Sequence, residues 1–422
     1  MFNGWKSCLV VGCVVAFLVT FPFLSNHAYC AEETLKIGVV GPLTGGAASI
    51  GDNVRMGATI AAEEINAAGG VLGKPIELIF ADSEGKPDVG VAAARRLITQ
   101  DRVRVLMGQY DEVTAMAQYD IALRHKVPIL TNGCTAGFMG EEIKKNPKKY
   151  RYLWKPVPPG ENHSRALVEI LESIVLDRKI YQPKTTNLTF TTDDTDWAIE
   201  HIAAAQKYLD QGRLGKLGWK ITYTETYAWG ETDFLAIMSK IRAADPTFHV
   251  DIDCHIPGCA AFMKQFRDAG IKCPLSMVYL PAAQEFSDIT GDAAEGLMYP
   301  GVIMIVPTDK GKRLVKKVYE KYGVDIGLEA NVGIAHDVVN MVAQAYERAG
   351  TLDDVDKFAD EMNKTRYNGM CGVYVWNPET HEGRSGEDYI PTQVFQFQNM
   401  ERVVIWPKRY ATGQYQLPDW TK

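Results

Sequence analysis

Two thiols and an imidazole lie within six positions of one another, at Cys254, His255 and Cys259. Thiolate and imidazole groups are the usual ligands of zinc, so this segment is the first place to look for a metal. A structural zinc site takes four ligands, however, and this spacing is not a standard zinc pattern. We therefore expect no metal here, and we interpret these cysteines as disulfide partners or buried thiols.

Acidic and glycine-rich segments offer no clearer chemistry. The run from Asp193 to Asp196 lacks the glycine and the terminal glutamate of a calcium loop, and its Asp and Thr side chains suit helix capping instead. Gly41 to Gly46 matches neither a phosphate loop nor a dinucleotide fingerprint, and no Gly-x-Ser-x-Gly or His-Glu-x-x-His motif occurs. We expect a protein that is not an enzyme and needs no cofactor, with His255 as its one candidate acid–base group.

The first thirty residues differ from the rest of the chain. Lys6 is their only charge, and the segment from Cys8 to Leu24 is almost continuously apolar. Small residues then precede Ala31, so residues 1–30 are interpreted as a signal peptide cleaved near Cys30/Ala31, which predicts a periplasmic mature chain. Two alternatives stay open, namely an uncleaved anchor, which the short apolar run disfavours, and acylation of Cys30, which the bulky preceding residue disfavours.

The net charge limits the classes of binding partner, and the number of cysteines limits the number of disulfides. The chain carries a formal charge of −7, which becomes −8 when Lys6 leaves with the signal peptide, and no basic stripe is present. Nucleic acid and anionic lipid are therefore poor partners. Five cysteines remain after cleavage, which allows one or two disulfides with at least one thiol left over. Cys259 with Cys254 or with Cys273 are the local candidates, and the others are Cys134 and Cys371.

Hydrophobic periodicity predicts strands that alternate with helices. Such an alternation, with short loops, predicts a parallel sheet covered on both faces. The length of 422 residues suits two or three domains. The first series has expected strands at 35–40, 76–81, 103–107 and 127–130, and expected helices at 52–67, 87–100 and 114–125.

The proline-rich segment 155–160 interrupts this alternation, and its stiffness suits a crossing between two lobes. A second series follows it. The segment 284–350 then resembles the first lobe again, and the chain from Met370 onward is β-like and rich in aromatic residues. The second series has expected strands at 186–191, 220–227, 249–253 and 275–279, and expected helices at 164–175, 197–210, 234–244 and 260–269.

Several segments, taken together and in order, resemble one protein family. The most specific of them open the mature chain, at 37–45 and 62–73. The others are Gly57-Ala58, Phe80–Asp82, Val127–Leu130, Lys264–Gly270 and Gly291–Gly296. Over nearly all of its mature length, the chain resembles the periplasmic solute-binding proteins of branched-chain amino acid and amide ABC transporters, the Leu/Ile/Val-binding protein family.

The resemblance implies a type I periplasmic binding protein fold. This is an α/β fold with two doubly wound, Rossmann-like lobes joined by three crossovers. The N-terminal lobe would comprise residues 31–156 plus 284–370, and the C-terminal lobe residues 157–283 plus 371–422. A ligand would bind in the cleft between the lobes, at the carboxyl ends of the strands, and closure of the lobes would capture it.

The implied function is that of a monomeric extracytoplasmic solute-binding protein. It would deliver a small polar ligand, such as an amino acid, amide, amine or aromatic acid, to the membrane permease of an ABC transporter. The alternative is a ligand-sensing domain of a receptor or regulator with the same fold. A sensor would carry a further signalling segment, and because none is recognisable we favour transport.

The resemblance also places a set of loop residues at the ligand. All of them follow strand ends of the two lobes. They are Ser49, Gln109, Tyr110, Asp111, Glu112, Thr131, Asn132 and Gly133 from the first lobe, with Asp194, Asp196, Trp197, His255, Tyr279 and Gln284 from the second.

Two departures from the amino-acid binders of the family bear on the ligand. Where those proteins receive a carboxylate with small hydroxyl residues and backbone N–H groups, this chain has the acids Asp111 and Glu112, which would repel it. Either these acids turn to solvent or the ligand lacks a carboxylate there. Trp197, Tyr110 and Tyr279 would form aromatic walls suited to an amine, a quaternary ammonium or an aromatic ring. Trp154 is a further candidate, although we expect it in the core.

Overall fold

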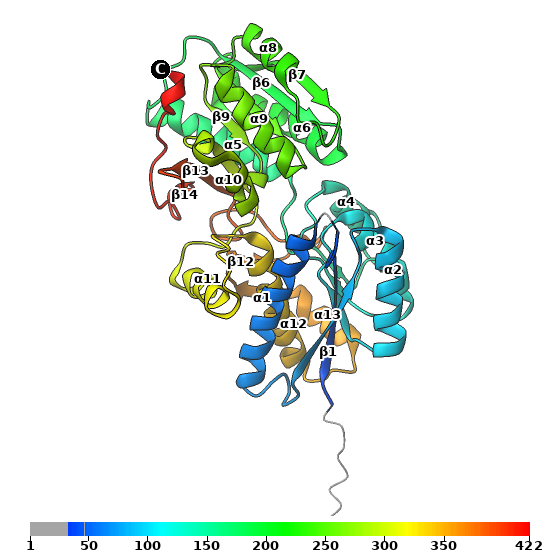
Figure 1. The fold of residues 1–422 in the computed structure, drawn as a ribbon. Coiled ribbons are helices and arrows are strands. Elements are labelled where there is room, and N and C mark those ends of the chain that lie inside the picture. Colours follow the sequence, from blue (N-terminus) through cyan, green and yellow to red (C-terminus); the bar gives the residue numbers. More distant parts are fainter. Residues whose placement is uncertain (1–32, 46) are drawn as a thin grey trace, which may run out of the picture. The chain divides into compact units, whose positions relative to one another are not determined.

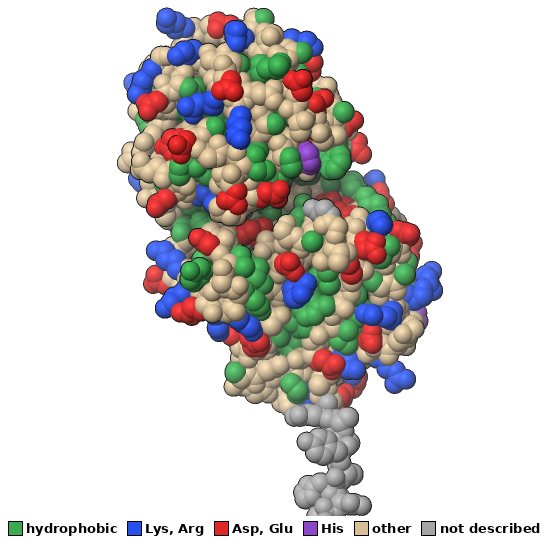
Figure 2. All heavy atoms as spheres, in the orientation of Figure 1, with side chains coloured by type: hydrophobic (Ala, Val, Ile, Leu, Met, Phe, Trp, Pro, Cys, Tyr) green, Lys and Arg blue, Asp and Glu red, His purple; other side chains and the backbone are tan. Residues whose placement is uncertain are grey.

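The computed structural model describes residues 33–45 and 47–422. The expected signal peptide at 1–30, its cleavage site and the possible acylation site at Cys30 lie outside the described residues. Within the described part of the chain, no helix is both long and apolar enough to cross a membrane. On the face drawn in Figure 2, Lys and Arg side chains are interspersed with Asp and Glu.

The first sheet is five-stranded and parallel throughout (Figure 1). Six of the seven residues of its inner strand β1 are buried, because helices cover both faces of a parallel sheet. The strand order places β1 and β3 side by side, although β2 lies between them in the chain. The strands, in spatial order, are β2 (Ile76–Asp82), β1 (Leu35–Gly41), β3 (Val105–Met107), β4 (Ile129–Leu130) and β5 (Leu153–Trp154).

Helices cover both faces of this sheet. In Figure 1, α1 and α12 lie on one side of β1 and α2 and α3 lie on the other, and each pair packs together. The helices of this part are α1 (Ala48–Ala67), α2 (Pro87–Arg96), α3 (Glu112–Arg124), α4 (Gly137–Lys145), α11 (Asp309–Tyr322), α12 (Ala330–Ala349) and α13 (Val355–Asn363). A two-stranded hairpin, β11 (Arg366–Asn368) with β12 (Val373–Val375), follows them.

The crossing of α1 and α12 depends on Gly57. A Cβ atom at this position would lie 2.1 Å from the carbonyl oxygen of Val332, which is backbone and has no rotamer to change. Gly57→Ala is therefore expected to lower the free energy of unfolding by about 1–3 kcal/mol, the usual cost of overpacking. Urea denaturation measures it. Gly137→Ala, where the added Cβ meets nothing within 4 Å, is the matched control and should be close to neutral. Equal costs for both variants would contradict this account of the crossing.

The second sheet has seven strands and repeats the winding of the first. Its parallel part has the order β7-β6-β8-β9-β10, which in chain order is second, first, third, fourth and fifth, as in the first sheet. β13 pairs antiparallel to β10, and β14 pairs antiparallel to β13. The strands, in spatial order, are β14 (Glu401–Trp406), β13 (Gln393–Gln398), β10 (Met298–Gly301), β9 (Leu275–Met277), β8 (Phe248–Ile252), β6 (Asn187–Asp193) and β7 (Lys220–Tyr227).

One expected lobe boundary is wrong in the structure. The expected N-terminal lobe includes residues 284–370, yet β10 pairs with β9 and β13 of the second sheet. Tyr299 of β10 stacks on Phe395 of β13, a contact between segments far apart in the sequence. α10 (Gln284–Thr290) likewise packs on α9. Residues 284–301 therefore belong with the second sheet, and the chain returns to the first only after Gly301.

The segment 155–160 leaves the first sheet after β5 and leads into α5, which contacts β10 and β13 of the second sheet. It is thus a crossing from one sheet to the other, as its prolines suggest. The remaining helices are α5 (Glu161–Glu172), α6 (Asp196–Gln211), α7 (Arg213–Lys216), α8 (Leu235–Ala243) and α9 (Ile256–Asp268).

Candidate functional site

The carboxyl ends of both parallel sheets carry the loops that contain the expected site residues. In the first sheet these are the loops after β1, β3 and β4, and in the second sheet those after β6, β8 and β9. In both sheets the order reverses between the first and third strands, and such a switch point leaves a crevice between loops that diverge to opposite faces. The two switch points lie at β1/β3 and at β6/β8.

Tyr110 lies where these loops meet. Its ring packs on Gly133 so closely that a Cβ there would come within 2.6 Å of Tyr110 Cδ2. Burial raises the pKa of the Tyr110 phenol above its usual range, and the neighbouring Cys254, Glu112 and Glu329 raise it further. Because Cys254 follows β8 of the second sheet, Tyr110 of the first sheet is surrounded by groups from both.

The two acids beside Tyr110 bind backbone rather than standing free in solvent. Asp111 caps α3, with Oδ1 accepting a hydrogen bond from Thr114 N at 2.7 Å. Glu112 Oε1 accepts a hydrogen bond from Ala136 N in the loop after β4. Both side chains are half-buried. Local N–H groups therefore hold one oxygen of each carboxylate.

A hydrogen bond joins the loops of the two sheets. Trp197 Nε1, in the first turn of α6, donates to Thr135 Oγ1 in the loop after β4, at 3.0 Å. The backbone oxygen of Thr135 accepts from Gly160 N, at the crossing between the sheets, at 2.7 Å. Thr135 was not among the expected site residues. Its only signal in the sequence is a hydroxyl side chain two positions after Gly133.

Two buried histidines, His201 and His163, pack against the indole ring of Trp197. His201 Nδ1 lies 2.6 Å from the carbonyl oxygen of Trp197, and its ring centroid lies 4.5 Å from that of the indole. His163 Nδ1 lies 3.0 Å from the carbonyl oxygen of Gly160 and 3.3 Å from His201 Nε2. Burial lowers the pKa of His201 to about 4 and that of His163 well below its usual value, so both rings are neutral at pH 7.

This pair predicts a loss of stability in mild acid. Between pH 6.5 and pH 4 the unfolded chain binds protons on these histidines and the folded chain does not, so the free energy of unfolding falls as pH falls. At pH 5 the loss is about 2 kcal/mol for His201, and His163 adds a loss in the same direction. Urea unfolding at pH 7 and pH 5 measures it. His201→Asn should reduce the difference in the free energy of unfolding between pH 7 and pH 5. His125→Asn, at an exposed histidine, is the control and should keep the wild-type difference. Identical pH dependence in both variants would contradict the assignment.

A second network joins the loop after β4, the start of α12 and the loop after β9. Asn132 Nδ2 donates to Asn331 Oδ1 at 3.0 Å, and Asn331 Nδ2 donates to Tyr279 Oη at 3.2 Å and to Glu329 Oε1 at 2.8 Å. Tyr279 Oη also donates to Glu329 Oε1 at 3.3 Å. Burial raises the pKa of Glu329, although its hydrogen bonds oppose this.

The backbone of Tyr279 is strained, with φ of +60° and ψ of −56°. A positive φ is unusual for a bulky residue and costs roughly 1–3 kcal/mol. The network of Glu329 and Asn331 holds Tyr279 in this conformation. Neither partner was expected from the sequence, because both precede or begin a helix that is far from Tyr279 in the chain.

Several expected site residues lie apart from this cluster. Gln109 and Thr131 are buried, and Gln109 Nε2 donates to Gln118 Oε1 of α3 at 2.9 Å. Gln284 is exposed and donates to Asp288 of its own helix at 2.9 Å. Three more lie at the exposed starts of helices or loops, with Asp194 Oδ1 accepting from Trp229 N at 2.8 Å; they are Ser49, Asp194 and Asp196.

His255 caps α9, since its Nδ1 accepts a hydrogen bond from Gly258 N at 3.2 Å. Its ring lies 5.2 Å from that of the exposed Trp229, centroid to centroid. Trp154 belongs to the core, as expected, because it is fully buried and its Nε1 donates to Asn363 Oδ1 at 2.9 Å. The aromatic walls of the candidate site are therefore Tyr110, Trp197 and Tyr279.

The expected disulfides do not form, and all five described cysteines are free thiols. Cys254 Sγ lies 3.3 Å from Thr195 Oγ1, whereas Cys259 Sγ lies 3.3 Å from Met277 Sδ, so the two sulfur atoms have different neighbours. Cys273 is buried. Among the residues that the structure describes, no group of three His, Cys, Asp or Glu side chains is placed to hold a metal ion.

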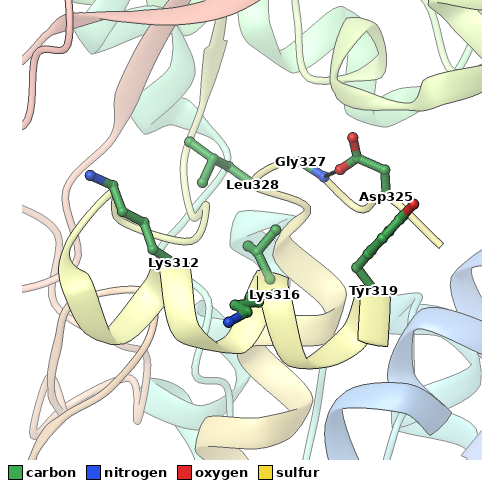
Figure 3. A pocket seen from close by; sticks show the side chains of 7 residues that line it. Lys312, Lys316, Tyr319, Asp325, Gly327 and Leu328 are labelled. Atoms are coloured by element: carbon green, nitrogen blue, oxygen red, sulfur yellow. Dashed lines mark hydrogen bonds between the residues drawn. The ribbon is translucent and has the colours of Figure 1, made fainter. Parts of the chain in front are cut away.

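A separate hollow lies on the outside of α11 (Figure 3). Figure 3 shows Lys312, Lys316 and Tyr319 projecting from this helix, with Asp325 accepting a hydrogen bond from Gly327 N at 2.9 Å. It contains none of the expected site residues. Val315 and Leu328 complete its lining.

Comparison with known proteins identifies the family. The profile of the periplasmic binding protein family matches residues 34–395. The Leu/Ile/Val-binding protein BraC3 of Rhizobium johnstonii is 37% identical over 329 residues, which cover 78% of this chain and 83% of the relative. The leucine-, isoleucine-, valine-, threonine- and alanine-binding protein of Pseudomonas aeruginosa is 25% identical over 342 residues, covering 81% of this chain and 85% of the relative.

Solved structures confirm the fold. A putative branched-chain amino acid ABC transporter protein from Silicibacter pomeroyi superimposes with a TM-score of 0.84 at 26% identity, covering 92% of this chain and 100% of that one. LivJ of Streptococcus pneumoniae, solved with isoleucine, gives a TM-score of 0.71 at 21% identity, covering 89% and 100%. The expected type I fold and the expectation of a binding protein rather than an enzyme are thereby confirmed. This chain belongs to the periplasmic binding protein family.

Proposed function

We propose that this protein captures a small amino acid or a related amine in the periplasm and delivers it to the permease of an ABC transporter. In this proposal the first lobe comprises residues 34–156 and 302–370, and the second comprises 157–301 and 371–422. The ligand lies between the carboxyl ends of the two sheets, and closure of the lobes around it generates the form that the permease receives.

The observation that carries the proposal is the hydrogen bond from Trp197 to Thr135. It joins side chains from the two sheets at their carboxyl ends, beside Tyr110 and Gly133. A ligand that contacts Tyr110 on one side and Trp197 on the other would stabilise the closed arrangement, since it makes both contacts only when the lobes are together.

The relatives narrow the ligand class. Those named above are described as binding leucine, isoleucine, valine, threonine or alanine, and each of these ligands carries an ammonium group. Around Tyr110 the neighbouring ionisable groups are Cys254, Glu112, Glu329 and Asp111, which favour a positive charge over a negative one. Because Asp111 and Glu112 are bound to backbone N–H groups, an amino acid whose carboxylate lies away from them remains compatible with the site.

A ligand panel tests the proposal. Purified protein is screened by thermal shift and then by calorimetry with branched-chain and small amino acids, their amides, simple amines and aromatic acids. A true ligand at one hundred times its Kd should add about 2.7 kcal/mol to the free energy of unfolding. Mass spectrometry of the released ligand should return it unchanged. Failure of every compound to bind, or recovery of an altered product, would overturn the proposal.

A further inference from the structure

A line of buried polar groups runs beneath α9 in the second lobe. His249, Asp251 and Asp253 alternate along and just beyond β8, so they share one face of the strand. The ring of His249 stacks on Phe262 and Phe266 of α9, with centroids 5.6 and 5.7 Å apart, which shows that this face is the one α9 covers. All three polar side chains are at most 2% exposed.

The hydrogen bonds among these groups determine which nitrogen of His249 carries a proton. Thr191 Oγ1 donates to Asp251 Oδ1 at 2.6 Å, so the 3.1 Å contact between Thr191 Oγ1 and His249 Nε2 requires the imidazole to donate. His249 Nδ1 then accepts from Thr189 Oγ1 at 2.7 Å. This arrangement makes His249 neutral, and burial lowers its pKa to about 3. His249 is therefore no counter-ion for the carboxylates.

The two aspartates lack enough donors for two negative charges. Asp251 Oδ1 accepts from Thr191 and, at 3.0 Å, from Tyr227 Oη, and Asp253 Oδ1 accepts from His255 N at 2.7 Å. The Oδ2 atoms of both aspartates are buried without a hydrogen-bond partner. Neither aspartate forms an ion pair with any residue that the structure describes. Two carboxylates buried two residues apart on one face of a strand cannot both ionise without a large penalty.

The groups that face this pair add no positive charge. Asp193 on β6 is itself an acid, and it accepts from Thr195 and from Cys254 N. The ring of His255 is directed to its own helix, where Nδ1 accepts a hydrogen bond from Gly258 N. Burial raises the pKa of Asp253 to about 7 and that of Asp251 well above its usual value. The other ionisable groups are Tyr227 on β7, Cys254 after β8, Cys259 on α9 and the half-buried Glu231 before α8.

We propose that Asp251 and Asp253 hold one proton between them at neutral pH, and that this proton keeps the loop 253–255 closed against α9, so that the second lobe's half of the site depends on pH. Loss of the proton to water leaves two buried carboxylates. They gain solvation only if the loop and the start of α9 move away from β8. The loop is held there through Cys254 N and His255 N, which donate to Asp193 and Asp253.

One consequence of this inference, weaker ligand capture at alkaline pH, rests on the proposed function. The test of the inference itself needs no ligand. Hydrogen–deuterium exchange of the peptide covering 253–262 is measured from pH 6 to pH 9 and corrected for the intrinsic rate. In the wild type, protection should fall as pH rises, by up to tenfold for each pH unit, while the closed pair still holds the proton that opening releases. It should level off once the closed pair has lost that proton.

Asp251→Asn removes one of the two carboxyls and leaves Asp253 with Asp193 as its acidic neighbour, so fewer protons are released on opening and protection should fall less steeply over the same range. Asp268→Asn, at the exposed end of α9, is the matched control and should follow the wild type. Infrared difference spectra of the wild type between pH 6 and pH 9 should also show the loss of a protonated carboxyl band, which tests the proposal even if Asp251→Asn fails to fold. A flat wild-type profile, an Asp251→Asn profile as steep as that of the wild type or no such band would overturn the inference. A failed ligand panel would leave it standing.

Discussion

Glu382→Gln is expected to lower the free energy of unfolding by about 3–5 kcal/mol, the usual cost of leaving one member of a buried ion pair without its partner. Lys155 Nζ lies 2.7 Å from Glu382 Oε1, and their side chains are 0% and 7% exposed. Lys155 Nζ also donates to Ala136 O at 2.9 Å, which does not neutralise its charge. The substitution therefore leaves a buried ammonium with no counter-ion.

The position of this pair makes it important to the whole chain. Lys155 begins the first crossing between the sheets, and its backbone N donates to His381 O at 3.0 Å while Gly383 N donates to Lys155 O at 2.8 Å. The ion pair thus links the first crossing to the segment that returns to β13. Because the pair joins two segments that lead from one sheet to the other, its loss should lower the stability of both sheets together.

Urea unfolding, read from the shift of the midpoint at constant slope, measures this effect. Glu379→Gln is the matched control. Glu379 pairs with Lys144 at 2.9 Å, but their side chains are 63% and 53% exposed, and such pairs contribute about 0–1 kcal/mol. The double variant Lys155→Met with Glu382→Gln should recover part of the loss, since no unpaired charge remains. Equal effects of Glu382→Gln and Glu379→Gln would show that the pair is not a stabilising element.

The alternation of strands and helices could be predicted because both signals are local. Continuous apolar runs such as β1 and amphipathic segments such as α1 are visible in any short window of the sequence. The place of β10 could not be predicted in this way. It is only four residues long, and its assignment depends on pairing with β13, almost one hundred residues later. Register between distant segments leaves no periodic trace in either of them.

The residues of the candidate site also fall into two groups, those that a local pattern predicts and those that depend on distant segments. Tyr110 and Trp197 directly follow or begin elements with clear patterns, so their place at strand ends could be predicted once the family was recognised. Thr135, Glu329 and Asn331 are recognisable only through partners that are distant in the sequence. For Gln109, the position after a strand predicts contact with the ligand. In the structure its amide instead donates a hydrogen bond to Gln118. Side-chain direction at a strand end is decided by packing, which the sequence does not display.

The largest effect on ligand affinity is expected from Tyr110→Ala and Trp197→Ala. Each removes an aromatic wall from one side of the candidate site, and loss of a central aromatic anchor costs at least about 2 kcal/mol, or roughly 30-fold in Kd. Calorimetry with the best compound of the ligand panel measures the change. Tyr319→Ala, at an exposed tyrosine on α11, is the control for loss of a phenol ring and should leave Kd unchanged.

Trp197→Phe separates the two roles of the indole. It keeps an aromatic ring against the ligand and removes only the hydrogen bond to Thr135 Oγ1. If that bond mainly holds the lobes together, Trp197→Phe should weaken ligand binding by less than Trp197→Ala does. Trp197→Phe should also speed ligand release, because the closed form loses a contact that the ligand itself does not make. Stopped-flow dissociation distinguishes the two. Wild-type affinity in both Tyr110→Ala and Trp197→Ala would place the ligand elsewhere on the chain, whereas a normal release rate in Trp197→Phe would remove only the role of Thr135 in closure.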